Sequence, residues 1–290
     1  MQEKSKKNKV LVTGSDGQLG QCLKKIKNSY LNLDFHFTNS KSLNIVEKDK
    51  IEHLFSEHEF DFVINCAAYT NVEQAEKEPT KAFLINAEGV KNLAEVCKKH
   101  KTTLIHISTD YVFDGKKKTP YTEEDLPNPI NEYGKSKRKG EEYIEEILES
   151  YFIIRTSWLY SEFGKNFYKT IIEKSKTEKE LTITTSEIGT PTNANDLARF
   201  VLDLIQINDK KYGIYHYSNL GEATWYEFAK EILKLLGKHE SVMLKKTNNY
   251  PTFAVRPEYS VLSKEKTLEI FNTSILNWAL SMSEIDKFMQ

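Results

Sequence analysis

Residues 9–27 read KVLVTGSDGQLGQCLKKIK, and this stretch decides the fold. A β run from Val10 to Thr13 meets Gly14, Gly17 and Gly20 and then passes into an amphipathic helix. The glycines permit a tight turn and a close approach of backbone to a pyrophosphate, whose charge the N–H groups of the helix start can hold. The spacing is G-x-x-G-x-x-G, which a plain loop can also show. Its place between a strand and a helix favours a dinucleotide cradle.

The second predicted strand, near Asp34 to Thr38, ends in Thr38-Asn39-Ser40-Lys41. No carboxylate stands there to accept the 2′-hydroxyl of an adenosine ribose, which an NAD-selective site usually provides. Lys41 and the neighbouring hydroxyls suit a 2′-phosphate instead. The sequence therefore favours NADPH as the cofactor, with NADH as the alternative.

Strand and helix patterns then alternate along the chain, in the order helix 47–58, strand 62–64, helix 83–99, strand 104–107, helix 141–149 and strand 151–158. This order predicts an α/β fold, a Rossmann-type doubly wound parallel sheet. The third strand ends in small residues, Asn65-Cys66-Ala67-Ala68, against which a flat cofactor can lie, although alanine is equally an ordinary core residue. We expect the helix at 83–99 to bury Leu84, Leu93 and Val96 and to present Asn86 at its cofactor end.

A hydroxyl, a phenol and an amine lie within the stretch from Ile105 to Lys137. Thr109 closes an apolar run, so it should lie at the carboxyl end of a buried strand, where open α/β sheets bind ligands. Tyr133 and Lys137 stand four apart at a predicted helix start and therefore share a face. A neighbouring ammonium lowers the pKa of a phenol towards the neutral range, which makes this an acid–base arrangement. Tyr226 and Lys230 have the same spacing but no strand-end hydroxyl, which is typical of an ordinary helix surface.

Composition narrows the class of protein. The 290 residues include 41 basic and 42 acidic side chains and carry a net charge of −1, which argues against a nucleic-acid-binding or membrane-surface protein. No stretch approaches the eighteen apolar residues of a membrane span. Three cysteines, far apart in apolar surroundings, indicate reduced core thiols rather than disulfides or a metal site, and hence a cytoplasmic protein.

Several blocks of the sequence follow the order of one known family. GSDGQLG, STDYVFDG, YGKSK and RTSWLY occur in succession, accompanied by NCAAYTNVEQAEKEP, GTPT, YHYSNLGEATWYEFA and the Arg256-Pro257 segment. Through these blocks the chain resembles the extended short-chain dehydrogenase/reductases and, more narrowly, the dTDP-4-dehydrorhamnose reductase family. The resemblance implies NADPH-dependent reduction of the C4 ketone of dTDP-4-dehydro-L-rhamnose to dTDP-L-rhamnose, a step of nucleotide-sugar biosynthesis for cell-surface polysaccharide.

The resemblance also implies roles for individual residues. Thr109, Tyr133 and Lys137 would form the catalytic set. The dTDP-sugar would be bound by Thr109, Asp110, Trp158 and Arg256, although spacing alone favours a structural loop residue at Arg256. The cofactor would be held by Gly14, Asp16, Gly17, Gln18, Leu19, Gly20, Asn44, Ala67, Ala68, Tyr69, Asn86, Tyr133 and Lys137.

The same resemblance suggests how the chain divides into domains. We expect residues 1–155, completed by about 182–215, to form the dinucleotide-binding domain. Residues 156–181 and 216–290 would form a smaller C-terminal α/β substrate-binding domain. No partner other than the dTDP-sugar is expected, neither nucleic acid nor membrane, and the protein would be a monomer or a homodimer.

Three departures from the family pattern bear on the site. Ser186-Glu187 stands where the family often has Asp-Gln, which affects contacts on the substrate side, and Asn44 replaces a common Asp on the adenine side. Members of the family can carry magnesium at a dimer contact, but Asn195 stands where a carboxylate would be expected, so magnesium is not assignable and no metal ligand is predicted.

Two other functions remain open at this point. One is a non-catalytic regulatory subunit like that of methionine adenosyltransferase, which uses the same fold. The other is a reductase or epimerase of another nucleotide sugar. The intact set of Thr109, Tyr133 and Lys137 favours an enzyme, since a binding module needs no acid–base group.

Overall fold

The computed structural model describes residues 7–207 and 210–286. A six-stranded sheet forms its centre, with the order β2-β1-β3-β4-β5-β10 and every neighbouring pair parallel. The six strands are β1 (Asn8–Thr13), β2 (Leu33–Phe37), β3 (Phe62–Asn65), β4 (Thr103–Thr109), β5 (Tyr151–Thr156) and β10 (Gly213–His216). The predicted doubly wound parallel sheet is confirmed.

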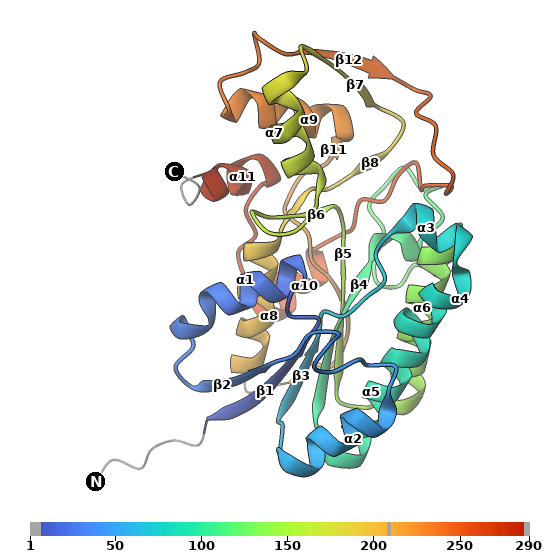
Figure 1. Ribbon diagram of the computed structural model, residues 1–290, viewed down its shortest axis with the longest axis vertical. Helices are drawn as coiled ribbons and strands as arrows, with labels where there is room; N and C mark the ends of the chain where they lie inside the picture. Colours follow the sequence, from blue (N-terminus) through green and yellow to red (C-terminus); the bar gives the residue numbers. More distant parts are fainter. Residues whose placement is uncertain (1–6, 208–209, 287–290) are drawn as a thin grey trace.

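Helices cover both faces of this sheet (Figure 1). On one face lie α1 (Gln18–Ile26) and α8 (Ala194–Gln206), and on the other lie α2 (Lys48–Glu57), α5 (Gly89–His100) and α6 (Glu132–Ile147). Within β1, Val10 and Val12 pack in the α1/α8 core while Leu11 packs in the α2/α5/α6 core. Because successive side chains of a strand point to opposite faces, a continuous apolar strand suits a sheet that is buried on both sides.

The segment before α5 differs from the predicted single helix at 83–99. It consists of α3 (Val72–Lys77), α4 (Pro79–Phe83) and a π-helical turn, η2 (Leu84–Glu88), that runs directly into α5. Leu93 and Val96 are buried as expected, but Leu84 is exposed, so its predicted place on the inner face is wrong. A π-turn adds one residue to the helical repeat, which rotates the preceding residues away from the face that the 3.6-residue pattern predicts.

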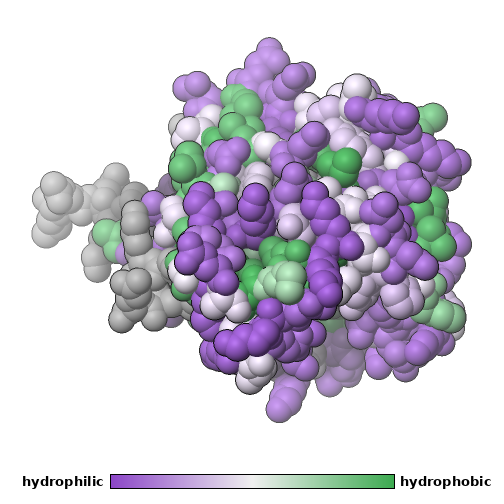
Figure 2. All heavy atoms as spheres, turned by 90° about the horizontal axis from the view of Figure 1, so that it is seen from above, coloured by the Kyte–Doolittle hydropathy of each residue, from purple (hydrophilic) through white to green (hydrophobic). Residues whose placement is uncertain are grey.

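A second, smaller lobe stands above the carboxyl ends of the strands (Figure 1). Its helices are α7 (Phe167–Thr177), α9 (Trp225–Leu235) and α11 (Trp278–Asp286), and its short strand pairs are β6 (Leu159–Tyr160) with β9 (Thr192–Asn193), β7 (Glu180–Thr184) with β12 (Met243–Thr247), and β8 (Ile188–Gly189) with β11 (Ala223–Thr224). Thr224 caps α9 through a reciprocal capping box with Glu227, which confirms the predicted helix start. The outer face of this lobe is mostly hydrophilic (Figure 2).

The chain crosses between the two lobes several times. Helix α8 and strand β10 return to the large sheet, whereas β7 pairs with β12 in the small lobe. We infer two domains whose bounds differ from the predicted ones, because β7, β8 and β9 belong to the smaller domain and α10 packs on the large sheet. The remaining elements, η1 (Lys27–Ser29), η3 (Asp110–Val112) and α10 (Glu265–Phe271), are short connections around the large sheet.

A buried ion pair fixes α6 to the sheet. Arg155 of β5 donates from Nε and Nη2 to the two carboxylate oxygens of Glu141, at 2.9 and 2.8 Å, and both side chains are almost completely buried. Arg138 makes a further contact with the same carboxylate. The charges around Glu141 hold the pKa of its carboxyl below the ordinary value, against the effect of burial, chiefly through Arg155.

We expect Arg155→Met to lower the free energy of unfolding by about 3–5 kcal/mol, because it leaves the Glu141 carboxylate buried without its bidentate partner. Urea denaturation followed by circular dichroism measures this loss. The control is Lys99→Met, which removes the exposed partner of Glu52 and should cost no more than about 1 kcal/mol. Similar losses in both variants would contradict the anchoring role of the buried pair.

Candidate active site

A cavity of about 600 Å³ lies at the carboxyl ends of the central strands, between the two lobes. Loops after β1, β3, β4 and β5 supply one wall, and residues of α7 and α9 supply the other. This is the place where an open parallel sheet binds its ligands. The residues that were predicted from the sequence and that line this cavity are Gly17, Gln18, Leu19, Ala68, Thr109, Asp110, Tyr133, Lys137, Trp158 and Arg256.

The glycine loop is shaped by two close approaches of backbone. Gly14 has φ +63°, and a Cβ there would lie 2.5 Å from the Ala67 nitrogen. A Cβ on Gly20 would lie 2.5 Å from Cα of Ser15. These two glycines therefore build the loop rather than line the cavity. The first turn of α1 has no side-chain cap at Gly17, which leaves its N–H groups suited to an anion.

Asp16 lies beside the end of β2. Its carboxylate accepts hydrogen bonds from Asn39 Nδ2 at 2.7 Å and from Lys24 Nζ at 3.1 Å, and these two donors lower the pKa of the carboxyl. The strand end itself carries no acid, as the sequence predicted, yet the glycine loop brings one next to it. Lys41 contributes a nearby positive charge. This corner thus offers both a carboxylate and cations to an adenosine ribose.

Asn86 holds the loop that follows β3. Its side chain accepts from the backbone N–H of Tyr69 at 2.8 Å and donates to the Tyr69 carbonyl at 2.9 Å and to Ser136 Oγ at 3.0 Å. Asn86 thus fixes the backbone of Tyr69, whereas the Ala67 N–H donates to Asn65, and of Ala67, Ala68, Tyr69 and Asn86 only Ala68 lines the cavity. Asn44 lies farther off, where its side chain accepts from the Val46 N–H in the loop before α2.

Thr109 and Tyr133 meet at the floor of the cavity. Thr109 is the last residue of β4, and Tyr133 lies in the first turn of α6, which Asn131 caps by accepting from the Gly134 N–H at 2.8 Å. Burial raises the pKa of Tyr133 to about 12, and the Thr109 side chain beside the phenol acts in the opposite direction. At neutral pH the phenol therefore keeps its proton.

Lys137 lies one helical turn after Tyr133 and is 2 % exposed. Its amine donates to the Ile107 carbonyl at 2.6 Å and lies 3.2 Å from His106 Nε2. Burial lowers the pKa of Lys137 to about 8. The expected lowering of the tyrosine pKa by this amine does not occur in the structure, because burial dominates both groups and the amine is engaged with β4.

Asp110 is the buried acid of the site. One carboxylate oxygen accepts from Thr109 Oγ1 at 3.1 Å, and the other, Oδ2, is buried without a partner in the described part of the chain. Burial raises the pKa of this carboxyl to about 7, although the neighbouring Ser260 and Thr109 side chains act in the opposite direction. Near neutral pH it can therefore either donate or accept a hydrogen bond at the cavity wall.

Trp158, in the loop after β5, connects that wall to α9. Its backbone has φ +43°, its ring lies against Gly189, where a Cβ would come within 2.6 Å, and it stacks on Trp225 with ring centroids 3.7 Å apart. A non-glycine residue in this conformation is strained and persists only where its surroundings hold it. The strain and the stack therefore fix a flat apolar surface in the cavity wall.

Arg256 joins the cavity to a second groove of about 390 Å³ between α7, β7 and the loop before Arg256. Its Nη2 donates to Glu73 Oε1 at 3.0 Å, and Glu73 Oε2 also accepts from the backbone N–H groups of Phe253 and Ala254. The Nε–H of Arg256 is buried without a partner in the described residues. The arginine thus has a structural tie to Glu73 while its side chain lines both the cavity and the groove.

Three further residues shape the site and were not among those predicted, namely His106, Glu73 and Trp225. His106 gave a usable signal, because it is the one titratable side chain within the apolar run from Leu104 to Ile107. Glu73 and Trp225 gave none. Their role depends on contacts with Arg256 and Trp158, which lie far away in sequence.

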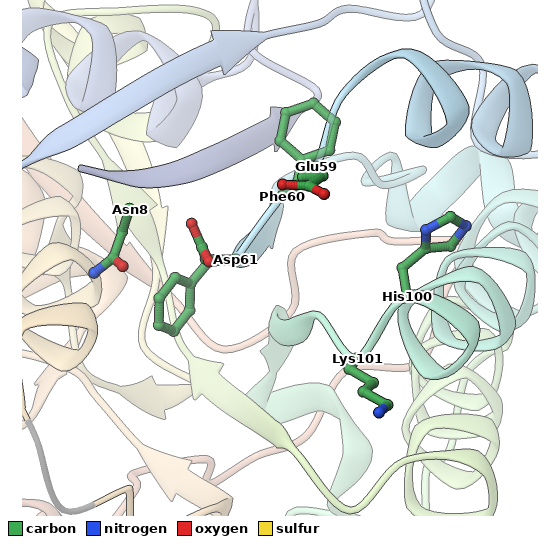
Figure 3. Close-up of a pocket in the computed structure, with 7 residues that line it drawn as sticks. Asn8, Glu59, Phe60, Asp61, His100 and Lys101 are labelled. Atoms are coloured by element: carbon green, nitrogen blue, oxygen red, sulfur yellow. The ribbon is translucent and has the colours of Figure 1, made fainter. Parts of the chain in front are cut away.

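A separate hollow of about 490 Å³ lies at the opposite edge of the sheet, lined by Asn8, Phe62 and the turn at His100-Lys101 (Figure 3). It lies at the amino ends of the strands, away from every predicted site residue.

In the residues that the structure describes there is no cluster of three or more metal-ligating side chains. Asn195, which stands where a carboxylate would be expected, donates to Glu162 at 2.9 Å. Within the same ranges no helix is both long and apolar enough to span a membrane.

The chain was compared with protein families, characterised relatives and solved structures. A family model described as the RmlD substrate binding domain matches residues 8–289. The Bacillus subtilis spore coat polysaccharide biosynthesis protein SpsK is 41 % identical over 88 % of this chain and 89 % of its own. The dTDP-4-dehydrorhamnose reductase of Aggregatibacter actinomycetemcomitans is 36 % identical over 97 % and 99 %. The crystal structure of the Bacillus anthracis dTDP-4-dehydrorhamnose reductase in complex with NADP is 36 % identical over 97 % and 99 %, with a TM-score of 0.92.

Asp110 gives the protein a distinctive dependence of stability on pH. Its pKa is higher in the folded protein, about 7, than in an unfolded chain, about 3.9, so folding favours its protonated form and stability falls as pH rises between these values. Asp110→Asn removes this loss. Relative to wild type, its free energy of unfolding should rise between pH 5 and pH 8, by about 1.4 kcal/mol for each unit of pKa difference titrated.

Urea denaturation at pH 5, 6, 7 and 8 measures this effect. The control is Asp114→Asn, because hydrogen bonds lower the pKa of Asp114 and its contribution is already present at pH 5. The Asp114→Asn difference from wild type should stay constant over the same range. A pH-independent difference for Asp110→Asn as well would contradict the raised pKa.

Proposed function

Because this chain belongs to the dTDP-4-dehydrorhamnose reductase family, we propose that it reduces the C4 ketone of dTDP-4-dehydro-L-rhamnose to dTDP-L-rhamnose with NADPH. The observation that carries the proposal is that Thr109, Tyr133 and Lys137 line one cavity, beside a glycine loop suited to a pyrophosphate. The product is a precursor for cell-surface polysaccharide. The acting species is a monomer or a homodimer in the cytoplasm, without a nucleic-acid or membrane partner.

Tyr133 is the proton donor in this mechanism. When bound, NADPH supplies a hydride to C4, and the C4 oxygen gains negative charge. Thr109 orients that oxygen by a hydrogen bond, and Tyr133 transfers its phenolic proton to it. An alkoxide is far more basic than a phenolate, so a phenol with a pKa of about 12 still gives up its proton readily in this step.

The glycine loop and the loop after β3 would hold the cofactor. The N–H groups at the start of α1 would bind its pyrophosphate, and Lys137 would hold the nicotinamide ribose beside Tyr133. At the adenosine end, Lys41 and the hydroxyl groups near it favour a 2′-phosphate, whereas Asp16 also suits a free 2′-hydroxyl. We therefore assign NADPH as the preferred cofactor and NADH as a second one.

The dTDP-sugar occupies the rest of the cavity and the second groove. Asp110 and Trp158 lie on either side of the sugar, and Arg256, at the junction of the two spaces, binds the diphosphate. Its side chain is 25 % exposed and lines both spaces. A screen of NADPH oxidation against different 4-keto nucleotide sugars tests the substrate and distinguishes it from those of related reductases and epimerases. A total absence of turnover would favour a non-catalytic subunit.

Tyr133→Phe tests the acid. This variant should fold normally and bind NADPH nearly as well as wild type, but kcat should fall by roughly two to four orders of magnitude, the scale of a lost general acid. Turnover is measured by NADPH absorbance, and cofactor binding by fluorescence titration. As a control, Tyr226→Phe changes a tyrosine outside the site that stands four residues before a lysine, as Tyr133 does. Near-normal turnover by Tyr133→Phe with NADPH bound would refute the mechanism.

Arg256→Lys tests the substrate side. An ammonium cannot reproduce the bidentate fork of a guanidinium on a diphosphate, so the Kd for dTDP should rise at least tenfold while that for NADPH hardly changes. Calorimetric titrations of the folded variant with each ligand measure both. Arg199→Lys, on the exposed side of α8, serves as the matched control. Unchanged dTDP binding, or an equal loss for both ligands, would leave Arg256 with only its structural tie to Glu73.

A further inference from the structure

A chain of buried polar side chains lies beneath Tyr133 and crosses three strands. Thr13 Oγ1 donates to Asn65 Oδ1 at 2.7 Å, Asn65 Nδ2 lies 3.0 Å from His106 Nδ1, and His106 Nε2 lies 3.2 Å from Lys137 Nζ. None of the four side chains is more than 2 % exposed. The mechanism above uses only the last of them, which leaves the purpose of the other three to be explained.

The hydrogen bonds of Asn65 determine which way its amide faces. The backbone N–H of Ala67 can only donate, and it lies 3.1 Å from Oδ1, so this atom is the oxygen. Nδ2 must then be the atom that faces His106, where it can only donate. It follows that His106 Nδ1 accepts a hydrogen bond and carries no proton.

The position of the proton on His106 follows. Burial and the nearby Lys137 hold the pKa of this imidazole well below its ordinary value, so the ring is neutral. A neutral imidazole carries a single N–H, and since Nδ1 is the acceptor, that N–H is on Nε2. The N–H therefore points at the amine of Lys137.

This arrangement distinguishes the two protonation states of Lys137. An ammonium has no lone pair, so in that state the Nε2–H would face a cation without an acceptor. A neutral amine has one lone pair, which can accept from Nε2–H while an amine hydrogen donates to the Ile107 carbonyl at 2.6 Å. The imidazole thus favours the neutral amine.

Resting on the proposed function, we propose that Asn65 and His106 are positioning residues that fix the Nε2–H tautomer and thereby stabilise Lys137 as a neutral amine. Each turnover removes a proton from Tyr133. When the Lys137 ammonium passes a proton towards the phenolate, it becomes a neutral amine, which accepts the hydrogen bond from His106 Nε2–H. The amine then regains a proton from solvent.

The other groups that face Lys137 were considered as sources of the same effect. Glu141, one turn farther along α6, favours the ammonium, but its charge is largely balanced by Arg155. The thiol of Cys66, at the end of β3, has its pKa raised to about 12 by burial and is neutral, as is the Tyr133 phenol. Of the described neighbours, His106 is therefore the one that selects the amine by direct hydrogen bonding.

Nitrogen NMR of the folded protein, labelled in histidine, tests the tautomer without any assay of activity. In wild type, His106 should show a proton-bearing Nε2 and a bare Nδ1, and its signals are assigned by their loss in His106→Gln. His216 is an internal control with the opposite tautomer, because its Nδ1 lies 3.1 Å from the Tyr121 carbonyl and must donate a hydrogen bond to it. A proton on Nδ1 of His106 would overturn the proposal, whatever substrate the enzyme uses.

Asn65→Asp tests the coupling to Lys137, since a carboxylate of the same shape accepts from Nδ1–H and reverses the tautomer. His106 Nε2 would then accept from the ammonium, and the titration midpoint of Lys137, measured by NMR of labelled lysine, should rise by at least one unit. His106→Gln, whose amide oxygen can turn towards the ammonium, should also raise the midpoint and serves if Asn65→Asp does not fold. An unchanged midpoint in the folded variants would refute the coupling.

Discussion

The site depends on the anchoring of α6 to β5 by the ion pair between Glu141 and Arg155. Tyr133, Lys137 and Glu141 are spaced four residues apart, so they form one line along the face of α6 that meets the sheet. Because Glu141 is held by two hydrogen bonds of 2.9 and 2.8 Å, the rotation of the helix about its axis is fixed. The phenol is thereby placed at Thr109 and the amine at His106. The charge pair lies outside the cavity, yet it sets the geometry within it.

A second contact relates the lobes to each other. Glu73 of α3 accepts two backbone N–H groups and the Arg256 guanidinium from a segment about 180 residues away in sequence. The cofactor half of the molecule therefore holds in place the arginine that we assign to the substrate half. The same arginine cannot be described as purely structural or purely ligand-binding. Glu73 satisfies one nitrogen, and the side chain still lines both the cavity and the groove.

Sequence reasoning reached the fold because the determining patterns are local. The run from Val10 to Thr13 followed by three spaced glycines specifies strand, turn and helix within twenty residues, and the later apolar strands repeat the pattern. It failed where a tertiary contact overrides the local period. Asn86 bonds the Tyr69 backbone from within a π-turn, and the extra residue of that turn exposes Leu84. Thr109, Tyr133 and Lys137 could be placed together because a strand end and a helical spacing are local patterns. The tie between Glu73 and Arg256 is a long-range contact and could not be predicted.

The pKa values within the cavity bear on the direction of the reaction. An exposed lysine and an exposed tyrosine titrate at nearly the same pH, about 10, with the lysine slightly higher. Burial separates them, since it disfavours the charged form of each group, and it lowers the pKa of Lys137 to about 8 while raising that of Tyr133 to about 12. At neutral pH the tyrosine is therefore protonated and can act as a proton donor, and the lysine exchanges its proton readily. Reduction of a ketone needs a donor for the forming alkoxide, whereas oxidation of an alcohol needs a base. The order of the two pKa values thus suits the site to reduction.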